Sequence, residues 1–468
     1  MSLTQKKNTN TTIYVILGLL LLFTFFSRLF ILNYANNIDP SRLVNKDISR
    51  YETPAIALVN TGSLVISKDK DTNDLRQGPG YQLLIAGVYK IMGGQNRYAL
   101  FIVQILIGLL TILMVYKLAA LLWSPLAGLF AVIFMVFSPT QLYYSLFLAT
   151  EIPFGLLSVS IVYAGVKLLN STHVDYKKWA LLLGLAIAVA TLIKTITTFL
   201  CFIVVIGIIL VKLVFAKRMQ AFSWKMVVNS SLLVILPFAL LMGSWTIRNG
   251  LTYGAYVYTD NPSSNLLIYR AGHIIQEKEN IDSIYDVKKM LRDQLNYSTL
   301  AERLEQEKAL AIKIILSNLD IFWDLIKGKE GIYSMLFESG MPNLSTLLND
   351  QVSTESSEQQ REAMLARHWW FSSLDLLVKL QLLAVYFFAI VGFILALKRA
   401  PQQAVLQVFI LFTILYYIVL SLGQHGLNYS RGRMTFMPLV IVYSGYGVVV
   451  MLELINILRN KKPKHSTT

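Results

Sequence analysis

The chain has 468 residues, of which 55% are hydrophobic and 15% are charged, and its mean hydropathy is +0.55. Soluble domains carry roughly 25% charged residues, so this composition excludes a soluble multidomain protein. The single cysteine, Cys201, excludes an internal disulfide and a thiolate zinc cluster, and the net charge of +15 has to be explained by where the basic residues lie.

Apolar runs long enough to cross a bilayer follow one another along the chain, since about 20 apolar residues span the hydrocarbon core as a helix. They predict ten spans, at 12–32, 98–122, 125–148, 152–170, 179–194, 196–214, 226–247, 373–397, 404–422 and 432–456. The run 79–93 is short and contains Lys90, so it is either an eleventh span or a helix on the membrane surface. The predicted fold class is an all-α polytopic membrane protein.

Loop charge decides between ten and eleven spans. With ten, every short basic loop falls on one side of the membrane, as the positive-inside rule requires. These residues are Lys6, Lys7, Lys117, Lys177, Lys178, Lys217, Arg218, Lys225, Lys398, Arg399 and the tail from Arg459 to Lys464. An eleventh span would place Lys6 and Lys7 opposite all later basic loops. We therefore predict a multi-pass cell (inner) membrane protein with both termini cytoplasmic, and no nucleic-acid partner.

Two long segments, 34–78 and 249–372, then lie on the outer face and hold 23 of the 27 acidic residues. They predict three parts: an N-terminal bundle with the first outer segment (1–248), an outer helical subdomain (249–372), and the C-terminal spans with the basic tail (373–468). Within the subdomain, 285–326 has helical periodicity, and 300–326 is predicted to be one amphipathic helix whose apolar face would rest on the membrane or on the bundle.

Ionisable residues at the ends of spans are the first candidates for function. Glu151, at the outer end of the fourth span, is either an interface residue whose carboxylate reaches water or the floor of an outward-facing cavity. Arginines at the same level either snorkel to lipid headgroups or bind a phosphate through their guanidinium forks. They are Arg28, Arg248, Arg431 and Arg433.

Other signals are weaker. Taken alone, Asp47 is a cap or a solvated charge in a polar loop, and His425 either lines a cavity or is an ordinary loop histidine. Asp69-Lys70-Asp71 has the form of an acidic metal-chelating pair but lies in a turn-rich stretch, so a divalent cation is unsupported and no cofactor is predicted. The sequence has no phosphate-binding Gly-x-x-x-x-Gly-Lys loop and no dinucleotide-binding glycine motif.

Five short groups of residues follow one another in a recognisable order. They are Asp47, Tyr51, Ala57 and Gly62; Gly78-Pro79-Gly80-Tyr81 with Lys90 and Gly93; Ser138-Pro139, Tyr144-Ser145 and Thr150-Glu151-Ile152-Pro153; Trp245, Arg248, Asn249 and Gly254; and Arg431, Arg433 and Pro438. In order and spacing they resemble bacterial family 39-like glycosyltransferases of the GT-C fold, which include protein O-mannosyltransferases and the lipid A aminoarabinose transferase. Two positions depart from that pattern: Ile48 replaces the second acid of an Asp-Glu pair, which argues against metal chelation there, and Gly78 replaces a proline.

The resemblance implies a sugar donor on a polyprenyl phosphate and an acceptor glycan, lipid or protein, both met at the outer edge of the bundle among membrane lipids. Our hypothesis is that Asp47 is the general base of an inverting transfer to an acceptor hydroxyl and that Glu151 orients the sugar or the acceptor or assists Asp47. Arg248, Arg431, Arg433 and Lys90 would then bind the donor phosphate, and Tyr51, Tyr81 and His425 would line the substrate site. The alternatives are an oligosaccharide ligase or polymerase, a lipid flippase or transporter, and a catalytically silent scaffold of the same fold.

Overall fold

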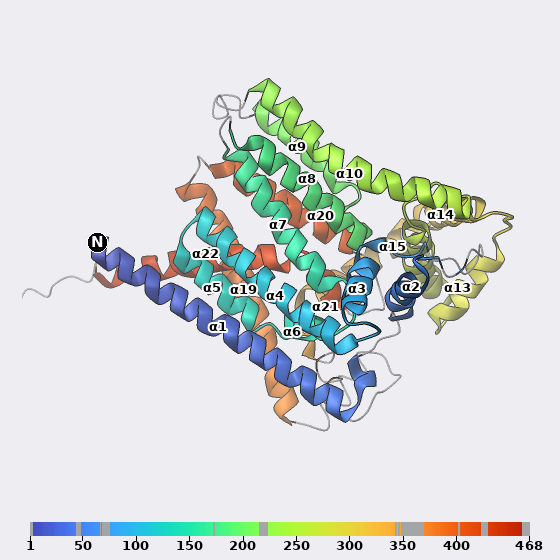
Figure 1. Cartoon of the computed structure of the whole chain (residues 1–468). Coiled ribbons are helices and arrows are strands. Elements are labelled where there is room, and N and C mark those ends of the chain that lie inside the picture. Colours follow the sequence, from blue (N-terminus) through green and yellow to red (C-terminus); the bar gives the residue numbers. More distant parts are fainter. Residues whose placement is uncertain are drawn as a thin grey trace, which may run out of the picture.

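The computed structural model describes residues 3–43, 48–65, 67, 75–171, 174–214, 223–341, 344, 347, 369–400, 403–422 and 429–460 (Figure 1). Every regular element in these ranges is helical, as the apolar periodicity predicts. Nine helices among the described residues are long and apolar enough to cross a membrane. They are α1 (Leu3–Ile38), α4 (Arg97–Leu122), α7 (Glu151–Leu169), α8 (Tyr176–Ile193), α9 (Leu200–Val214) with the turn η2 (Thr195–Thr197) before it, α10 (Trp224–Tyr253), α19 (Trp369–Arg399), α20 (Ala404–Ser421) and α22 (Met437–Asn460).

The tenth predicted span is present as a bent pair. Helices α5 (Pro125–Val136) and α6 (Pro139–Ser145) meet at 67°, where the sequence predicts one continuous helix over 125–148. Pro139 has no backbone N–H and disfavours helical geometry at Ser138, which instead caps α6 by accepting a hydrogen bond from the backbone N–H of Gln141. The count of nine or ten spans agrees with the prediction, and the chain is a multi-pass membrane protein.

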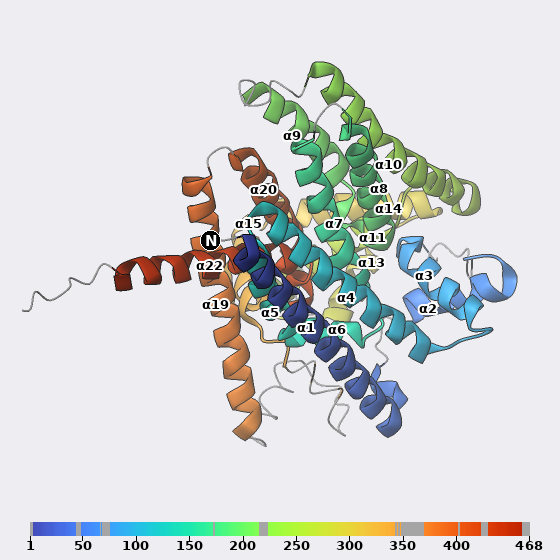
Figure 2. The ribbon, with the colours of Figure 1, turned by 60° about the vertical axis from the view of Figure 1, so that its left-hand side comes forward.

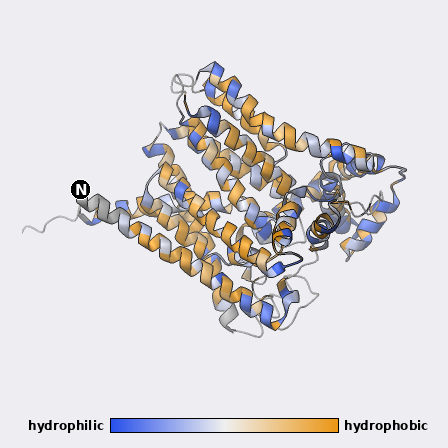
Figure 3. Cartoon of the chain, viewed as in Figure 1, coloured by the Kyte–Doolittle hydropathy of each residue, from blue (hydrophilic) through white to orange (hydrophobic). Residues whose placement is uncertain are grey.

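The bundle is built on close helix pairs. Helix α22 packs against both α19 and α5, and α8 packs between α7 and α10 (Figures 1 and 2). A Cβ at Gly447 would lie 1.9 Å from the carbonyl oxygen of Phe388, and one at Gly392 would lie 2.2 Å from that of Tyr443. Small residues thus bring the α19 and α22 backbones together, as is common between helices in membranes. Apolar residues cover these helices, whereas polar residues gather at the end of the molecule where Figure 1 labels α13 and α14 (Figure 3).

The segment between α1 and α4 contributes the short helices η1 (Pro40–Leu43), α2 (Ile48–Thr61) and α3 (Pro79–Ile91). At 1.5 Å per residue α3 is about 20 Å long, which is too short to cross the hydrocarbon core. This length agrees with the prediction that 79–93 is not an eleventh span. Helix α2 ends at Gly62, whose φ of 73° lies in the left-handed region that favours glycine.

A group of short helices follows α10 (Figure 1). They are α11 (Asn261–Asn265), the π-helical turn η3 (Leu266–Ala271), α12 (Gly272–Glu279), α13 (Ile284–Asp293), α14 (Leu300–Leu316), α15 (Leu319–Lys327), the turn η4 (Lys329–Tyr333) and α16 (Ser334–Phe337). The prediction of one helix over 300–326 is wrong. Asn318 leaves the helical conformation (φ −143°, ψ 49°), and its side-chain amide donates to the carbonyl of Ile314, which ends α14 and lets α15 start in a new direction.

Candidate active site

Glu151 lies at the centre of a charged cluster at the N-terminal end of α7. Its Oε1 accepts hydrogen bonds from Nε of Arg431 at 2.6 Å and from Nζ of Lys194 at 3.0 Å. Arg431 lies in the short helix α21 (Tyr429–Arg433), and Lys194 separates α8 from η2. The other oxygen, Oε2, is buried and has no hydrogen-bond partner among the described residues. We call these three residues the Glu151 cluster.

The two cations of the Glu151 cluster are more accessible than the carboxylate that holds them. The Glu151 side chain is 0% exposed, whereas those of Lys194 and Arg431 are 23% and 24% exposed. One negative charge faces two positive charges, so the cluster carries a net charge of +1. A buried carboxylate thus fixes two cations beside each other with their outer parts open to an anionic ligand.

The Gly-Pro-Gly-Tyr element positions Lys194. A Cβ at Gly78 would lie 2.3 Å from the hydroxyl of Tyr258 and 2.4 Å from the carbonyl oxygen of Leu192. A Cβ at Gly80 would lie 2.7 Å from the carbonyl carbon of the same Leu192. Only residues without a side chain allow α3 to begin this close to the end of α8, immediately before Lys194.

Tyr81 extends this contact toward Glu151. Its hydroxyl donates to Oε1 of Gln104 in α4 at 2.5 Å, and the Gln104 amide donates to the carbonyl of Phe147 at 3.0 Å. Phe147 lies in the turn that leads into Glu151 and α7. Tyr51 packs edge-on against Tyr81, with ring centroids 5.2 Å apart. The structure therefore brings the two predicted lining residues together, but both are buried, so they form the wall behind the cluster.

Helix α2, which begins at Ile48 directly after Asp47, is held by a buried carboxylate that the sequence did not single out. Glu52 accepts hydrogen bonds from the Tyr89 hydroxyl, the Gln95 amide and the Arg97 guanidinium, and Arg97 binds both carboxylate oxygens, at 2.8 and 2.7 Å. Burial raises the pKa of the Glu52 carboxyl, but these hydrogen bonds outweigh burial and hold the pKa below its ordinary value. Asp47 and His425 lie outside the described residues.

Arg433 has a different environment from Arg431. Its guanidinium is buried and donates to the backbone carbonyls of Met335, Leu336 and Glu338, at 3.3, 2.9 and 2.6 Å, and to the hydroxyl of Thr140. Residues two apart on a helix do not face the same way, which explains why two neighbouring arginines have different partners. Arg433 thereby ties the chain after α16 to α6.

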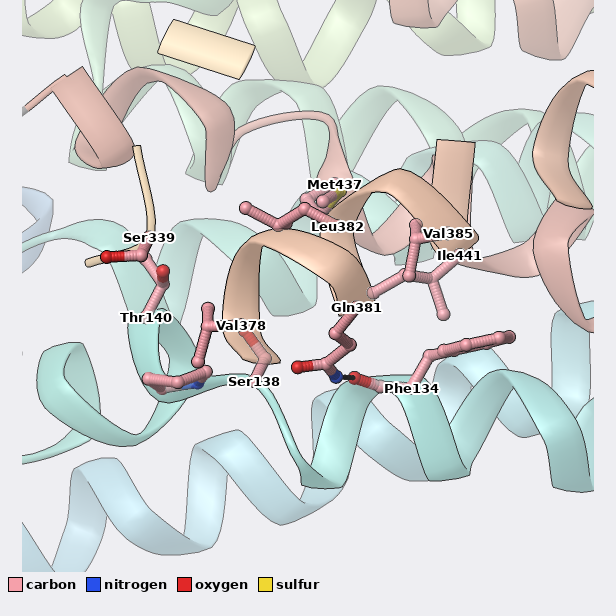
Figure 4. Close-up of a pocket in the computed structure, with 11 residues that line it drawn as sticks. Phe134, Ser138, Thr140, Ser339, Val378, Gln381, Leu382, Val385, Met437 and Ile441 are labelled. Carbon is pink, nitrogen blue, oxygen red and sulfur yellow. Dashed lines mark hydrogen bonds between the residues drawn. The ribbon is translucent and has the colours of Figure 1, made fainter. Parts of the chain in front are cut away.

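A small pocket adjoins Arg433 at the bend between α5 and α6 (Figure 4). Ser138, Thr140, Ser339 and Gln381 supply its polar groups. Apolar side chains from α5, α19 and α22 close it: Phe134, Val378, Leu382, Val385, Met437 and Ile441. Thr140 is shared between this pocket and Arg433, so the pocket lies on the α6 side of the site.

The two remaining predicted phosphate ligands lie apart. The Arg248 guanidinium is 4.7 Å from the ring centre of Trp245 and 5.3 Å from that of Tyr253, and it donates to Oδ1 of Asn249 at 2.9 Å. Lys90 is exposed in the last turn of α3. Arg28 is buried in α1 against Gly108 of α4, where Nη1 has no hydrogen-bond partner among the described residues. The described part of the chain contains no group of three or more histidine, cysteine or acidic residues that could hold a metal ion.

Comparisons with known proteins agree with this architecture. The family described as "Dolichyl-phosphate-mannose-protein mannosyltransferase" matches residues 76–243, a segment that contains Gly78, Tyr81, Glu151 and Lys194. The resemblance expected from the sequence is confirmed. The matched segment is 168 of the 468 residues, so this likeness concerns that segment rather than the whole chain. A comparison with curated proteins gives no match.

Solved structures share the fold at low sequence identity. The apo oligosaccharyltransferase of Archaeoglobus fulgidus is 16% identical with a TM-score of 0.55, covering 96% of this chain and 51% of that one. The same enzyme tethered to an acceptor peptide with the NVT sequon has a TM-score of 0.52 at 16% identity, covering 93% and 51%. ArnT from Cupriavidus metallidurans bound to undecaprenyl phosphate has a TM-score of 0.43 at 11% identity, covering 97% and 81%. The chain thus spans about half the length of the oligosaccharyltransferase it matches.

Proposed function

We propose that this chain transfers a monosaccharide from a polyprenyl-phosphate donor to an acceptor hydroxyl on the outer face of the membrane, with inversion at the anomeric carbon. The Glu151 cluster is the observation that carries the proposal. Its two partly exposed cations share one buried carboxylate and lie at the outer end of the spans, where the phosphate of a lipid-linked donor would be. The family match supports it, because that family is described by a dolichyl-phosphate-linked sugar.

In the proposed reaction, the acceptor hydroxyl loses its proton to the carboxylate of Asp47 as its oxygen bonds to the anomeric carbon. The bond between that carbon and the phosphate oxygen breaks on the opposite face, and its electron pair leaves with the polyprenyl phosphate. The leaving group is already an anion, so it needs charge stabilisation more than a proton. Lys194 and Arg431 supply that stabilisation, and Glu151 positions both.

Roles for the other predicted residues follow from their contacts. Arg433 uses its donors on three backbone carbonyls, so we assign it the positioning of the 335–338 segment. Arg248, stacked on aromatic rings, and Lys90, on an exposed turn, are assigned to the donor's approach from the headgroup region. Asp47 and His425 keep the roles that the family resemblance implies, whereas the buried Tyr51 and Tyr81 are assigned to support the Glu151 cluster from behind.

The orientation in the membrane is part of the proposal. The N-terminal end of α1 and the C-terminal end of α22 lie at the same end of the bundle, away from α13 and α14 (Figures 1 and 2). Both termini are then cytoplasmic and the Glu151 cluster faces outward. Cys201 is buried, so a single cysteine introduced at Lys308 in α14 should react with an impermeant thiol reagent added to intact cells, and one at Lys177 should not. The reverse labelling would invert the orientation.

The first experiment compares wild type with Asp47→Asn in transfer from a panel of radiolabelled polyprenyl-phosphate monosaccharides to a membrane extract. We expect Asp47→Asn to lower turnover by a factor on the order of 10² to 10⁴ while donor binding survives. Asp39→Asn is the matched control, because Asp39 is a partly exposed acid of the same segment whose carboxylate accepts hydrogen bonds from Ser41. Full activity of Asp47→Asn would remove Asp47 as the base. Transfer of whole oligosaccharides instead of monosaccharides would favour a ligase.

A further inference from the structure

A second group of cations lies outside the Glu151 cluster, where the first outer segment meets the outer helices. Arg50 comes from α2, Arg76 from the turn before α3, and Lys288 and Arg292 from one face of α13. All four side chains are half-buried. We call them the basic cluster.

Hydrogen bonds and apolar contacts join the contributing segments. The Gln82 amide of α3 donates to the carbonyl of Arg50 at 3.1 Å, and Val287 and Leu291 of α13 pack in one apolar cluster with Ala311 of α14. The backbone N–H of Asp260 donates to the carbonyl of Leu75 at 3.1 Å, directly beside Arg76. Arg303 of α14 forms an ion pair with the same Asp260 at 2.9 Å, and Leu75 packs in one apolar cluster with Leu300 and Leu304 of α14. The basic cluster is therefore part of a built junction between two segments that are far apart in the sequence.

Two nearby carboxylates, Asp260 and Glu307, act on Arg76 and Lys288 and oppose part of their charge. Asp260 is engaged by Arg303, and Glu307 accepts a hydrogen bond from Ser264 at 2.8 Å. Arg76, Lys288 and Arg292 have no ion pair within the described residues. Burial lowers the pKa of Lys288, and the charges of Arg292, Arg76 and Arg50 lower it further. The pKa of Arg76 is lowered by burial and then by Arg50. Half-buried like charges so close together favour a bound anion.

We propose that the basic cluster binds a phosphate-bearing part of the acceptor. Arg76 and Arg292 are arginines, whose planar forks match phosphate oxygens, and together with Lys288 they suit a ligand with two or more negative charges better than a single carboxylate. The cluster is separate from the Glu151 cluster, so donor and acceptor anions would have different sites.

The position of Arg76 connects the two sites. It comes two residues before Gly78, where α3 begins against the end of α8 and Lys194. An acceptor anchored at the basic cluster would therefore lie on the outer approach to the donor phosphate. The assignment to the acceptor rests on the proposed function, whereas anion binding at this junction does not.

The test uses the full chain in lipid nanodiscs and inorganic pyrophosphate as the probe, with binding measured by calorimetry at constant ionic strength. Wild type should bind pyrophosphate saturably, and Lys288→Gln should weaken binding about tenfold. Lys289→Gln is the matched control, because Lys289 is the exposed neighbour in the same helix and the charge change is identical. Lys288→Arg, which keeps the charge, should retain binding and guards against misfolding of Lys288→Gln.

Equal affinities of Lys288→Gln and Lys289→Gln, or no saturable binding to wild type, would overturn the site. Saturable binding of glucuronate but not pyrophosphate would overturn the assignment to phosphate. In the transfer assay, Lys288→Gln should raise KM for the acceptor and leave KM for the donor unchanged, and an unchanged acceptor KM would overturn the acceptor role. Absence of any transfer by wild type would contradict the proposed function alone, because the pyrophosphate measurement does not depend on turnover.

Discussion

Lys194 and Arg431 donate to the same oxygen, Oε1 of Glu151, although they come from different helix ends and lie far apart in the sequence. Two cations held this close repel each other unless the shared carboxylate is charged. The arrangement therefore depends on Glu151, and an anion that arrives from outside meets two positive groups already in place. This preorganisation is what a phosphate leaving group requires.

Replacing Glu151 should separate the two cations. In Glu151→Gln the buried carboxylate becomes a neutral amide, and we expect a loss of stability of about 3 kcal/mol and a fall in turnover of roughly 10²-fold. Thermal unfolding in nanodiscs and the transfer assay measure the two effects. Glu453→Gln is the control, because Glu453 pairs with Arg399 while 54% exposed and should matter little. Unchanged turnover in Glu151→Gln would contradict the role of the cluster.

Lys194 should act on the leaving group. Lys194→Gln removes one positive charge without changing the fold of α8, and we expect turnover to fall by about 10²-fold. Inhibition by added polyprenyl phosphate should also weaken, because that product keeps the phosphate which Lys194 binds. Lys177→Gln, an exposed lysine at the start of the same helix, serves as the comparison. Inhibition that is equally strong in both variants would place the phosphate elsewhere.

The Glu52 carboxylate should make stability depend on pH. Its pKa in the folded protein lies below the ordinary value of 4.5, so its hydrogen bonds to Arg97, Tyr89 and Gln95 contribute stability above pH 4.5. That contribution should be lost as the pH falls through the folded pKa. Unfolding temperatures measured between about pH 3 and pH 7 should fall more steeply at the acid end for wild type than for Glu52→Gln. Glu305→Gln, at an exposed position of α14, should follow the wild-type curve.

Two glycines of α3 should respond in opposite directions. Gly78→Ala places a methyl group 2.3 Å from the Tyr258 hydroxyl, and we expect a loss of about 1–3 kcal/mol together with reduced transfer as Lys194 moves. Gly87 has nothing within 4 Å of an added Cβ, so Gly87→Ala should raise helix stability by about 0.5–1 kcal/mol. Thermal unfolding measures the stability change of both variants. If Gly78→Ala were as stable as wild type, the close contact of α3 with α8 would be incorrect.

The sequence predicts the spans because their apolar length is a local property, and it singles out Glu151 because an isolated acid in apolar surroundings is unusual. From the sequence we predict the same phosphate-binding role for Arg431 and Arg433. In the structure their side chains leave α21 in opposite directions and therefore have different partners. No sequence pattern around Lys194 marks it as functional, because a lysine at the end of a span is ordinarily a snorkelling residue. Glu52 likewise depends on partners from three other positions. The bend at Ser138 was visible only as one proline in an apolar run, and its angle is set by tertiary packing.

The bend between α5 and α6 also has a consequence for how the protein is made. Pro139 cannot donate a backbone hydrogen bond, and the backbone N–H of Ser138 donates to the carbonyl of Met135. The carbonyl of Phe134 is instead satisfied by the side-chain amide of Gln381, at 3.2 Å, from α19. Ribosomes synthesise α19 long after α5, so the newly inserted N-terminal half holds an unsatisfied carbonyl at the bend until α19 arrives. We therefore expect chains truncated before α19 to be recognised by membrane quality control, although most of their spans are already inserted.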